Sequence, residues 1–117
     1  MKKAYYARPI SLYGSKQEER DVETLRHLGF TAIDINKEEL QARAKSEGMG
    51  VFKPLVGSAE ALFFRSFLDS TIGAGVAKEI AWANEAGIPV VELPTLICSR
   101  SLSVDETRQR LKELGSR

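Results

Sequence analysis

Residues 61–92 read ALFFRSFLDSTIGAGVAKEIAWANEAGIPVVE, and this stretch decides the fold. It begins with an apolar run that has the length and aromatic content of a strand, and a turn with two glycines follows at 69–75. The pattern then predicts a helix over 76–86, ended by Gly87, and a second apolar strand over 88–91. A strand, a turn, a helix and a strand make a βαβ unit, whose two strands run parallel. The turn therefore lies at the carboxyl edge of a sheet, where open α/β sheets bind their ligands.

Strands and helices alternate along the rest of the chain as well. A serine or asparagine followed three residues later by glutamate, which is the signature of a helix start, occurs at Ser15, Asn36 and Ser103. The pattern predicts strands at 3–7, 30–35 and 96–99, helices at 15–28, 36–46 and 103–114, and an irregular loop at 48–58. Alternation of this kind predicts one domain over residues 1–117 with an α/β fold. We expect a flavodoxin-like (Rossmann-like) three-layer sandwich with a parallel sheet of roughly four to five strands, in the flavodoxin-like order.

The composition excludes several classes of function. Seventeen Lys and Arg stand against sixteen Asp and Glu, so the formal net charge is +1 and we expect neither nucleic acid nor a membrane as a partner. Cys98 is the only cysteine, which excludes an internal disulfide and a multi-cysteine metal site, and we expect no metal and no organic cofactor. The sequence shows no bilayer-spanning apolar run and no signal-peptide pattern, so the expected localisation is cytoplasmic.

The turn before the helix at 76–86 lacks the standard phosphate-binding patterns. Gly73 and Gly75 bare the backbone beside the unpaired N–H groups of the helix start, where an anion or a sugar could approach. The spacing G-x-G-x-x-G is incomplete, and there is no Gly-Lys-Ser/Thr ending. Glu79 lies at the edge of the apolar stripe that we expect to be buried, which consists of Val76, Ala77, Ile80 and Ala83. We expect the helix dipole to favour the ionised form of Glu79, as nucleophilic attack requires. By spacing alone, Glu79 is either such a nucleophile or a charge that simply suits a helix N-terminus.

Two motifs follow strands at the expected carboxyl edge. The first strand leads into YYARPI at 5–10, and the glycine-rich turn leads into GVAKEIAWA at 75–83, followed by GIPVV at 87–91. These motifs resemble the nucleoside 2-deoxyribosyltransferase-like family, which includes smaller relatives that hydrolyse nucleoside 5′-monophosphates. The resemblance runs from Tyr5 to about Leu93. It implies the same fold and the cleavage of an N-glycosidic bond between a base and a sugar.

The resemblance also implies a role for each matching residue. Glu79 would attack the anomeric carbon of the sugar and form a covalent glycosyl-enzyme intermediate, which water or a second base then resolves. Tyr5 or Tyr6 would border the sugar and help hold Glu79. Asp69 would lie near the base or the sugar hydroxyls. The sugar or its 5′ end would be lined by Ser70, Gly73 and Gly75.

Two arginines depart from the family pattern. Arg8 stands where the family has glycine, and it either crowds the pocket or grips a phosphate with its fork of donors. Arg65, inside the third predicted strand, either reaches an anion or marks an edge strand that faces solvent. Because of Arg8 and the short chain, we favour hydrolysis of a 5′-monophosphate over transfer of the sugar to another base. The alternative is a catalytically inactive module of the same fold that binds a nucleotide.

Two aromatic residues suggest partners for this chain. Trp82 falls away from the apolar stripe of its helix, which favours a subunit interface. The resemblance likewise implies a homodimer or a larger homo-oligomer, with a neighbour completing the pocket. Phe52, in the loop expected at 48–58, is the candidate for stacking on a base.

Overall fold

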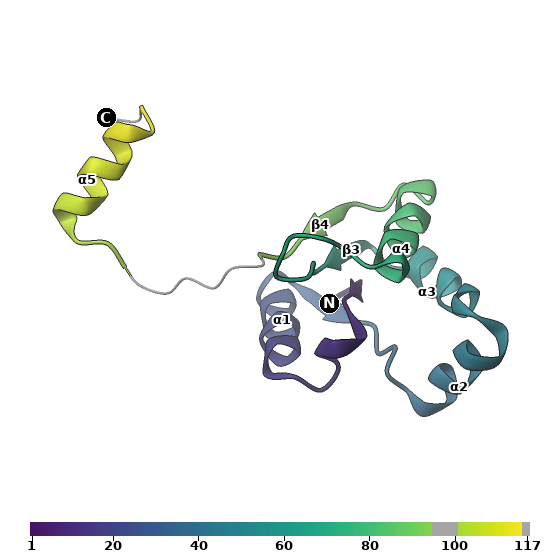
Figure 1. The fold of residues 1–117 in the computed structure, drawn as a ribbon. Helices are drawn as coiled ribbons and strands as arrows, with labels where there is room; N and C mark the ends of the chain where they lie inside the picture. The colour runs from purple at the N-terminus through teal and green to yellow at the C-terminus, as the bar shows by residue number, and fades with distance from the viewer. Residues whose placement is uncertain (95–100, 116–117) are drawn as a thin grey trace.

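The computed structural model describes residues 1–94 and 101–115, and its strands and helices alternate as predicted (Figure 1). Within these ranges no helix combines the length and the apolar character needed to cross a membrane. The elements are, in chain order, strand β1 (Lys2–Ala7), the 3₁₀ helix η1 (Ile10–Leu12), helix α1 (Lys16–His27), strand β2 (Phe30–Ala32), helix α2 (Glu38–Glu47), the 3₁₀ helix η2 (Met49–Phe52), helix α3 (Lys53–Ser58), strand β3 (Ala61–Phe64), helix α4 (Ala74–Glu85), strand β4 (Val90–Glu92) and helix α5 (Val104–Glu113).

The four strands form one parallel sheet in the order β2-β1-β3-β4. Tyr5 of β1 lies opposite Leu62 of β3, and Phe63 of β3 lies opposite Val91 of β4. This arrangement confirms the α/β fold class and the predicted order of the first four strands. The fifth strand predicted at 96–99 lies outside the described residues. Since β1 and β3 are the central strands, the loops that follow them meet at the carboxyl edge of the sheet.

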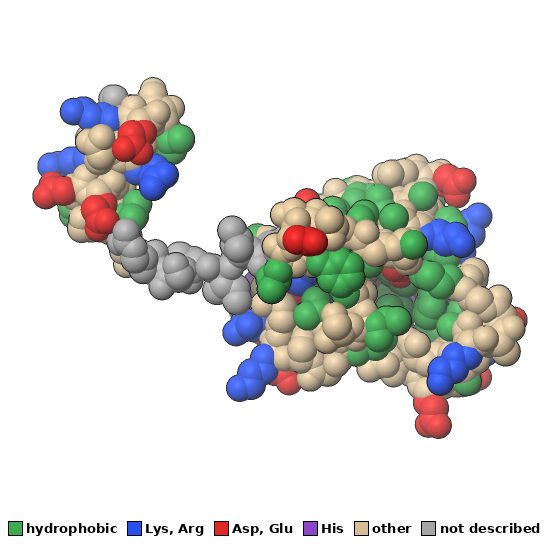
Figure 2. Space-filling model, in the orientation of Figure 1, with side chains coloured by type: hydrophobic (Ala, Val, Ile, Leu, Met, Phe, Trp, Pro, Cys, Tyr) green, Lys and Arg blue, Asp and Glu red, His purple; other side chains and the backbone are tan. Residues whose placement is uncertain are grey.

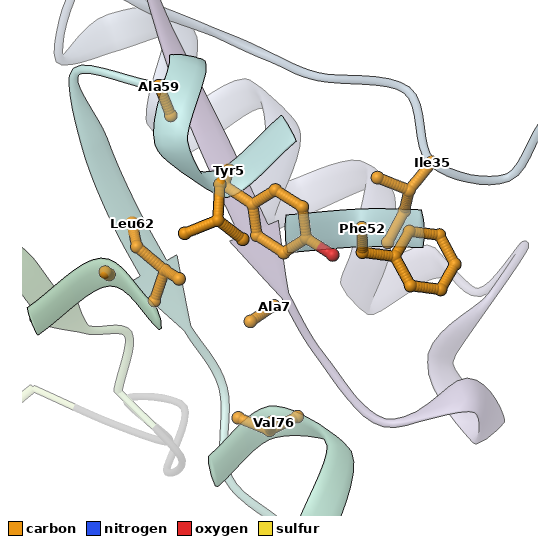
Figure 3. Close-up of a cluster of buried hydrophobic side chains, with 9 residues drawn as sticks. Tyr5, Ala7, Ile35, Phe52, Ala59, Leu62 and Val76 are labelled. Carbon is orange, nitrogen blue, oxygen red and sulfur yellow. The ribbon is translucent and has the colours of Figure 1, made fainter. Parts of the chain in front are cut away.

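The side chains of β1 alternate between two cores. Tyr5 and Ala7 point into the core that α3 and α4 cover, which Figure 3 shows, whereas Ala4 and Tyr6 point into the core that α1 covers. A period of two is that of a strand, and here both of its faces are buried. The alternation decides which of the two adjacent tyrosines can reach α4.

The prediction of an irregular loop at 48–58 is wrong, because this segment forms η2 and α3. Pro54 lies in the first turn of α3, where its missing N–H leaves no hydrogen bond unmade. Phe52 and Val56 are buried in the core beside Tyr5. Burial of these two side chains outweighs the helix-breaking tendency of the local glycines, which a propensity argument weighs too heavily.

Two of the three predicted helix caps are found. The side chain of Ser15 accepts a hydrogen bond from the backbone N–H of Glu18 at 3.1 Å, and Ser103 with Glu106 forms a complete capping box. Helix α2 lacks the predicted asparagine cap, since its N-cap is Lys37 and makes no side-chain hydrogen bond there. This helix has no fully buried residue, and it packs against the core through the partly buried Leu40 and Ala44.

The buried face of α4 differs from the predicted stripe. Val76, Glu79 and Ala83 are buried, at the i, i+3 and i+7 spacing of a helix face against a core. Ala77, expected inside, is exposed, while Trp82, expected outside, packs partly buried against the core. The position of Trp82 therefore gives no reason to expect a subunit interface there.

Arg65 neither faces an open edge nor reaches into a ligand pocket as a free cation. It is 7% exposed, and its Nε and Nη2 donate to the two carboxylate oxygens of Asp21 at 2.6 and 2.7 Å. Its Nη1 donates to the backbone oxygen of Pro94, and the Tyr6 hydroxyl donates to the same Asp21. The hydrogen bonds that Arg65 donates to Asp21 raise the pKa of Arg65, so its guanidinium stays charged. Arg65 thus joins α1 to β3 and the end of β4.

Candidate active site

A pocket of about 610 Å³ opens at the carboxyl edge of the sheet. Its walls come from the loop after β1, from α2 and η2, and from the first turns of α4. In Figure 2, hydrophobic side chains gather where this face of the molecule is hollowed. The lining is largely apolar, with Phe52 and Val76 among its members, and its charged residues are Arg8, Lys45 and Glu79. A mostly apolar cavity with a few convergent polar groups is the usual form of a small-molecule site.

Glu79 places a carboxylate at the wall of this pocket. The residue is 6% exposed, and its Oε2 accepts a hydrogen bond from the Tyr5 hydroxyl. Within residues 1–94 and 101–115, no group hydrogen-bonds to Oε1, yet that atom is not sealed from solvent. One oxygen is held by Tyr5 and the other is open to the pocket, which is the arrangement that an attacking carboxylate needs.

The pKa of Glu79 is raised to about 7. Burial is the largest cause, and the Tyr5 hydrogen bond and the Arg8 charge lower the pKa by less. The sequence argument expected the helix dipole to favour the ionised form, but Glu79 lies in the second turn of α4, beyond the reach of most of that effect. Desolvation therefore decides its charge, and Glu79 ionises near neutral pH rather than in the usual acidic range.

Replacing Tyr5 by phenylalanine is expected to shift any activity that needs ionised Glu79 to higher pH. The wild-type kcat/KM should rise with pH, and the midpoint of the rise should lie at the pKa of Glu79, about 7. Without the Tyr5 hydroxyl, a hydrogen bond to the charged form is lost, and the midpoint should move up by roughly one unit or more. The measurement is the pH profile of kcat/KM for the base-release reaction proposed below.

Tyr6→Phe is the matched control for this experiment. It removes the same hydroxyl from the adjacent residue, but on the opposite face of the sheet, where the partner is Asp21. The pH midpoint should then stay at the wild-type value. An unshifted midpoint in Tyr5→Phe would show that Tyr5 does not set the charge of Glu79.

Arg8 lines the pocket but is held in place by internal partners. Its Nε and Nη2 contact Oε2 of Glu18 at 2.9 and 2.8 Å, and its Nη1 donates to the backbone oxygen of Tyr6 at 2.9 Å. The guanidinium lies 4.5 Å from the centre of the Tyr6 ring and 4.7 Å from that of Tyr13. Every nitrogen of Arg8 therefore has a protein partner. It leaves the pocket open and acts on Glu79 through its charge.

Three residues of the expected site lie elsewhere. Tyr6 is buried on the α1 side of the sheet and cannot touch Glu79. Asp69 and Ser70 are exposed and do not line the pocket. The carboxylate of Asp69 instead accepts hydrogen bonds from the backbone N–H and the hydroxyl of Thr71, at 3.0 and 2.6 Å, which stabilises the turn. Of the predicted residues, the structure brings Glu79, Tyr5, Arg8, Gly73 and Gly75 together.

The two glycines let side chains, as well as a ligand, come close to the start of α4. A Cβ added at Gly75 would lie 3.2 Å from Sδ of Met49, and one at Gly73 would lie 3.7 Å from the Phe67 ring. A Cβ at position 75 would therefore make the Met49 side chain of η2 shift by a few tenths of an ångström. Both glycines also line the pocket.

The fold resembles that of a CMP N-glycosidase. A solved structure of this enzyme, BcmB from Clostridium botulinum, matches with a TM-score of 0.55 and 12% sequence identity. The match covers 97% of this chain and 99% of that chain. At this identity, the likeness to BcmB shows the fold alone. No protein-family model and no curated protein sequence matches this chain.

Tyr13, Gln41 and Lys45 are among the pocket residues that were not predicted from the sequence. Tyr13 follows η1, and Gln41 and Lys45 come from α2, and all three line the pocket with Glu79. Only the tertiary structure, which sets α2 at the pocket wall, brings Gln41 and Lys45 to the same cavity as Tyr13. The spacing of Gln41 and Lys45, four residues apart on one helix face, is the one signal that the sequence offers.

A second cavity, of about 590 Å³, lies along another face of α2. Its lining includes Lys37, Leu40 and Arg43 of that helix and its neighbourhood, and it does not include Glu79. Helix α2 therefore has open space on two flanks, in agreement with its lack of buried residues. We take the pocket on the Glu79 side as the candidate site, because it holds a buried carboxylate with a raised pKa.

Proposed function

We propose that this protein cleaves the N-glycosidic bond of a nucleoside or nucleoside 5′-monophosphate and releases the free base. The observation that carries the proposal is the Glu79 carboxylate, with one oxygen held by Tyr5 and the other open to the pocket. The pocket volume of about 610 Å³ is within the range of small-molecule sites. The fold likeness to BcmB and the motifs around Tyr5 and Glu79 support the same reaction class.

The proposed reaction has two steps and needs an ionised Glu79. Oε1 attacks the anomeric carbon, the bond from that carbon to the base nitrogen breaks, and its electron pair leaves with the base, which takes a proton from solvent. Water then attacks the same carbon, the ester bond to Glu79 breaks with its electrons returning to the carboxylate, and the water proton goes to solvent. Tyr5 keeps Oε2 hydrogen-bonded and so orients Oε1. We propose water as the acceptor, since it requires no second base site.

We propose that a 5′-phosphate, if present, is recognised by Lys45 rather than by Arg8. The charge of Arg8 is already paired with Glu18. Lys45 lines the same pocket, is exposed, and has no carboxylate within ion-pair distance among the described residues. An unpaired ammonium at the rim suits a phosphate as a point charge.

The alternative, an inactive nucleotide-binding module, loses its motivation in the structure. It rested on Arg8 and Arg65 as free cations, and both form internal ion pairs, with Glu18 and Asp21. A buried carboxylate with one open oxygen has no evident use in a purely binding site, because desolvating it costs free energy.

The proposal is tested with a panel of nucleosides and their 5′-monophosphates. Each compound is incubated with the protein at pH 8, where most of Glu79 is ionised, and free base is measured by chromatography. We expect base release from at least one compound, faster from the monophosphate than from its nucleoside. Absence of free base from every compound after long incubation would overturn the proposed function.

A further inference from the structure

The side chain of Gln41 has a fixed orientation at the wall of the pocket. Its Nε2 donates a hydrogen bond to the backbone oxygen of Ile35 at 2.7 Å. A carbonyl oxygen can only accept, so this contact determines which end of the amide is nitrogen and which is oxygen. The oxygen Oε1 is therefore an acceptor in a defined position, and Gln41 lines the same pocket as Glu79.

That acceptor has no partner within the protein. Among residues 1–94 and 101–115, no donor hydrogen-bonds to Oε1 of Gln41, and the atom is not sealed from solvent. Gln41 itself is partly buried beside apolar lining such as Phe52 and Val76. A ligand that displaces water from this region must supply a hydrogen-bond donor, because an unpaired polar group in an apolar surrounding costs free energy.

Tyr13 lines the pocket together with Gln41 and Glu79. The guanidinium of Arg8 lies 4.7 Å from the centre of the Tyr13 ring. Burial is the largest cause of a raised pKa at Tyr13, so the phenol is neutral and its O–H can donate. Among the described residues that O–H has no acceptor.

We infer that the pocket selects a base with an exocyclic amino group, cytosine or adenine, through Oε1 of Gln41 and the hydroxyl of Tyr13. Both bases present an amino donor beside a ring-nitrogen acceptor, which complements this acceptor and donor. Uracil and hypoxanthine present the opposite order, a carbonyl oxygen beside a ring N–H. In the same pose, their carbonyl oxygen would face Oε1 of Gln41, which is also an acceptor, and their ring N–H would face the Tyr13 hydroxyl, which is also a donor. The inference rests on the proposed function, since it assigns the base that the glycosidic cleavage would release.

The test compares two pairs of 5′-monophosphates that differ by one amino-to-oxo change, cytidine with uridine and adenosine with inosine. For each pair, kcat/KM of the wild-type protein should favour the amino member by about tenfold or more, the effect of one hydrogen bond left unmade. Gln41→Met removes Oε1 at similar length, so the amino member should lose most of that advantage while the oxo member changes little. Gln109→Met on α5, an exposed position of the same residue type, is the matched control and should keep the wild-type ratio.

Each outcome decides for or against the inference. Equal rates within each pair, a preference for the oxo members, or an unchanged ratio in Gln41→Met would overturn it. If Gln41→Met does not fold, as thermal unfolding would show, the wild-type ratios decide by themselves. If no compound releases base, the proposed function fails, and the inference is then judged on thermal-shift binding of the four monophosphates to the wild-type protein. A larger stabilisation by the cytidine and adenosine compounds would support it, and equal stabilisation within each pair would overturn it.

Discussion

Replacing Glu79 by glutamine is expected to reduce base release by at least about a thousandfold, because an amide cannot form the glycosyl ester. Glutamine keeps the size of the side chain and an oxygen that accepts from Tyr5, so the pocket should stay intact. The measurement is kcat for free base on the best compound of the panel. A residual rate within tenfold of wild type would show that Glu79 is not the nucleophile.

Glu85→Gln provides the matched control for that experiment. Glu85 lies on the same helix α4, but it is exposed, and within the described residues its ion-pair partner is Lys53, at 3.9 Å. The same chemical change there should leave kcat within about twofold of wild type, because exposed substitutions far from the pocket have small effects.

The same Glu79→Gln variant should also change how stability depends on pH. The pKa of Glu79 is raised from 4.5 to about 7 by folding, so below pH 4.5 the carboxyl is neutral in both the folded and the unfolded state. As pH rises from 4.5 to about 7, the unfolded state releases this proton while the folded state keeps it, so the wild type loses about 3 kcal/mol of its free energy of unfolding. The variant has no such loss. The difference in free energy of unfolding between the variant and wild type should therefore grow in favour of the variant from pH 4.5 to pH 8, as measured by urea unfolding. If the two free energies change with pH in parallel, burial does not raise the pKa of Glu79.

Replacing Asp21 by alanine is expected to lower the free energy of unfolding by about 3–5 kcal/mol. The cost does not reflect the strength of an isolated ion pair. It arises because Arg65, which is 7% exposed, would keep its charge and lose both carboxylate acceptors. The Tyr6 hydroxyl would lose its acceptor as well. Urea unfolding at pH 7 measures the effect, and a loss below about 1 kcal/mol would show that water reaches and solvates Arg65.

Two further variants separate burial from charge in this experiment. Glu23→Ala removes an exposed carboxylate from the same helix α1, where it contacts Arg26 at 3.4 Å, and should cost only a few tenths of a kcal/mol. The double variant Asp21→Leu with Arg65→Met replaces the pair by apolar groups of similar volume. It should recover most of the lost stability, since neither charge is then left buried without a partner.

Local patterns were sufficient for the sheet and for the helix that carries Glu79. The strand character of the stretch that contains Leu62, the glycine-rich turn and the helix that carries Glu79 are all short-range features, and all are present in the structure. The caps at Ser15 and Ser103 follow the same logic, because a capping hydrogen bond spans only three residues. Local patterns failed for segment 48–58, where they predicted a loop. The helices of this segment depend on the burial of Phe52 beside Tyr5 of a strand that is far away in sequence.

The sequence by itself determined the βαβ framework, the parallel order of the strands and the helix on which Glu79 lies, because hydrophobic period and turn chemistry act over a few residues. Only the tertiary structure decided which neighbours Glu79 has. It set Tyr5 rather than Tyr6 against the carboxylate, paired Arg8 and Arg65 with Glu18 and Asp21, and brought Tyr13 and Gln41 to the pocket. The physical reason is that charge, desolvation and hydrogen-bond partners depend on distances in space, and these residues are far apart along the chain.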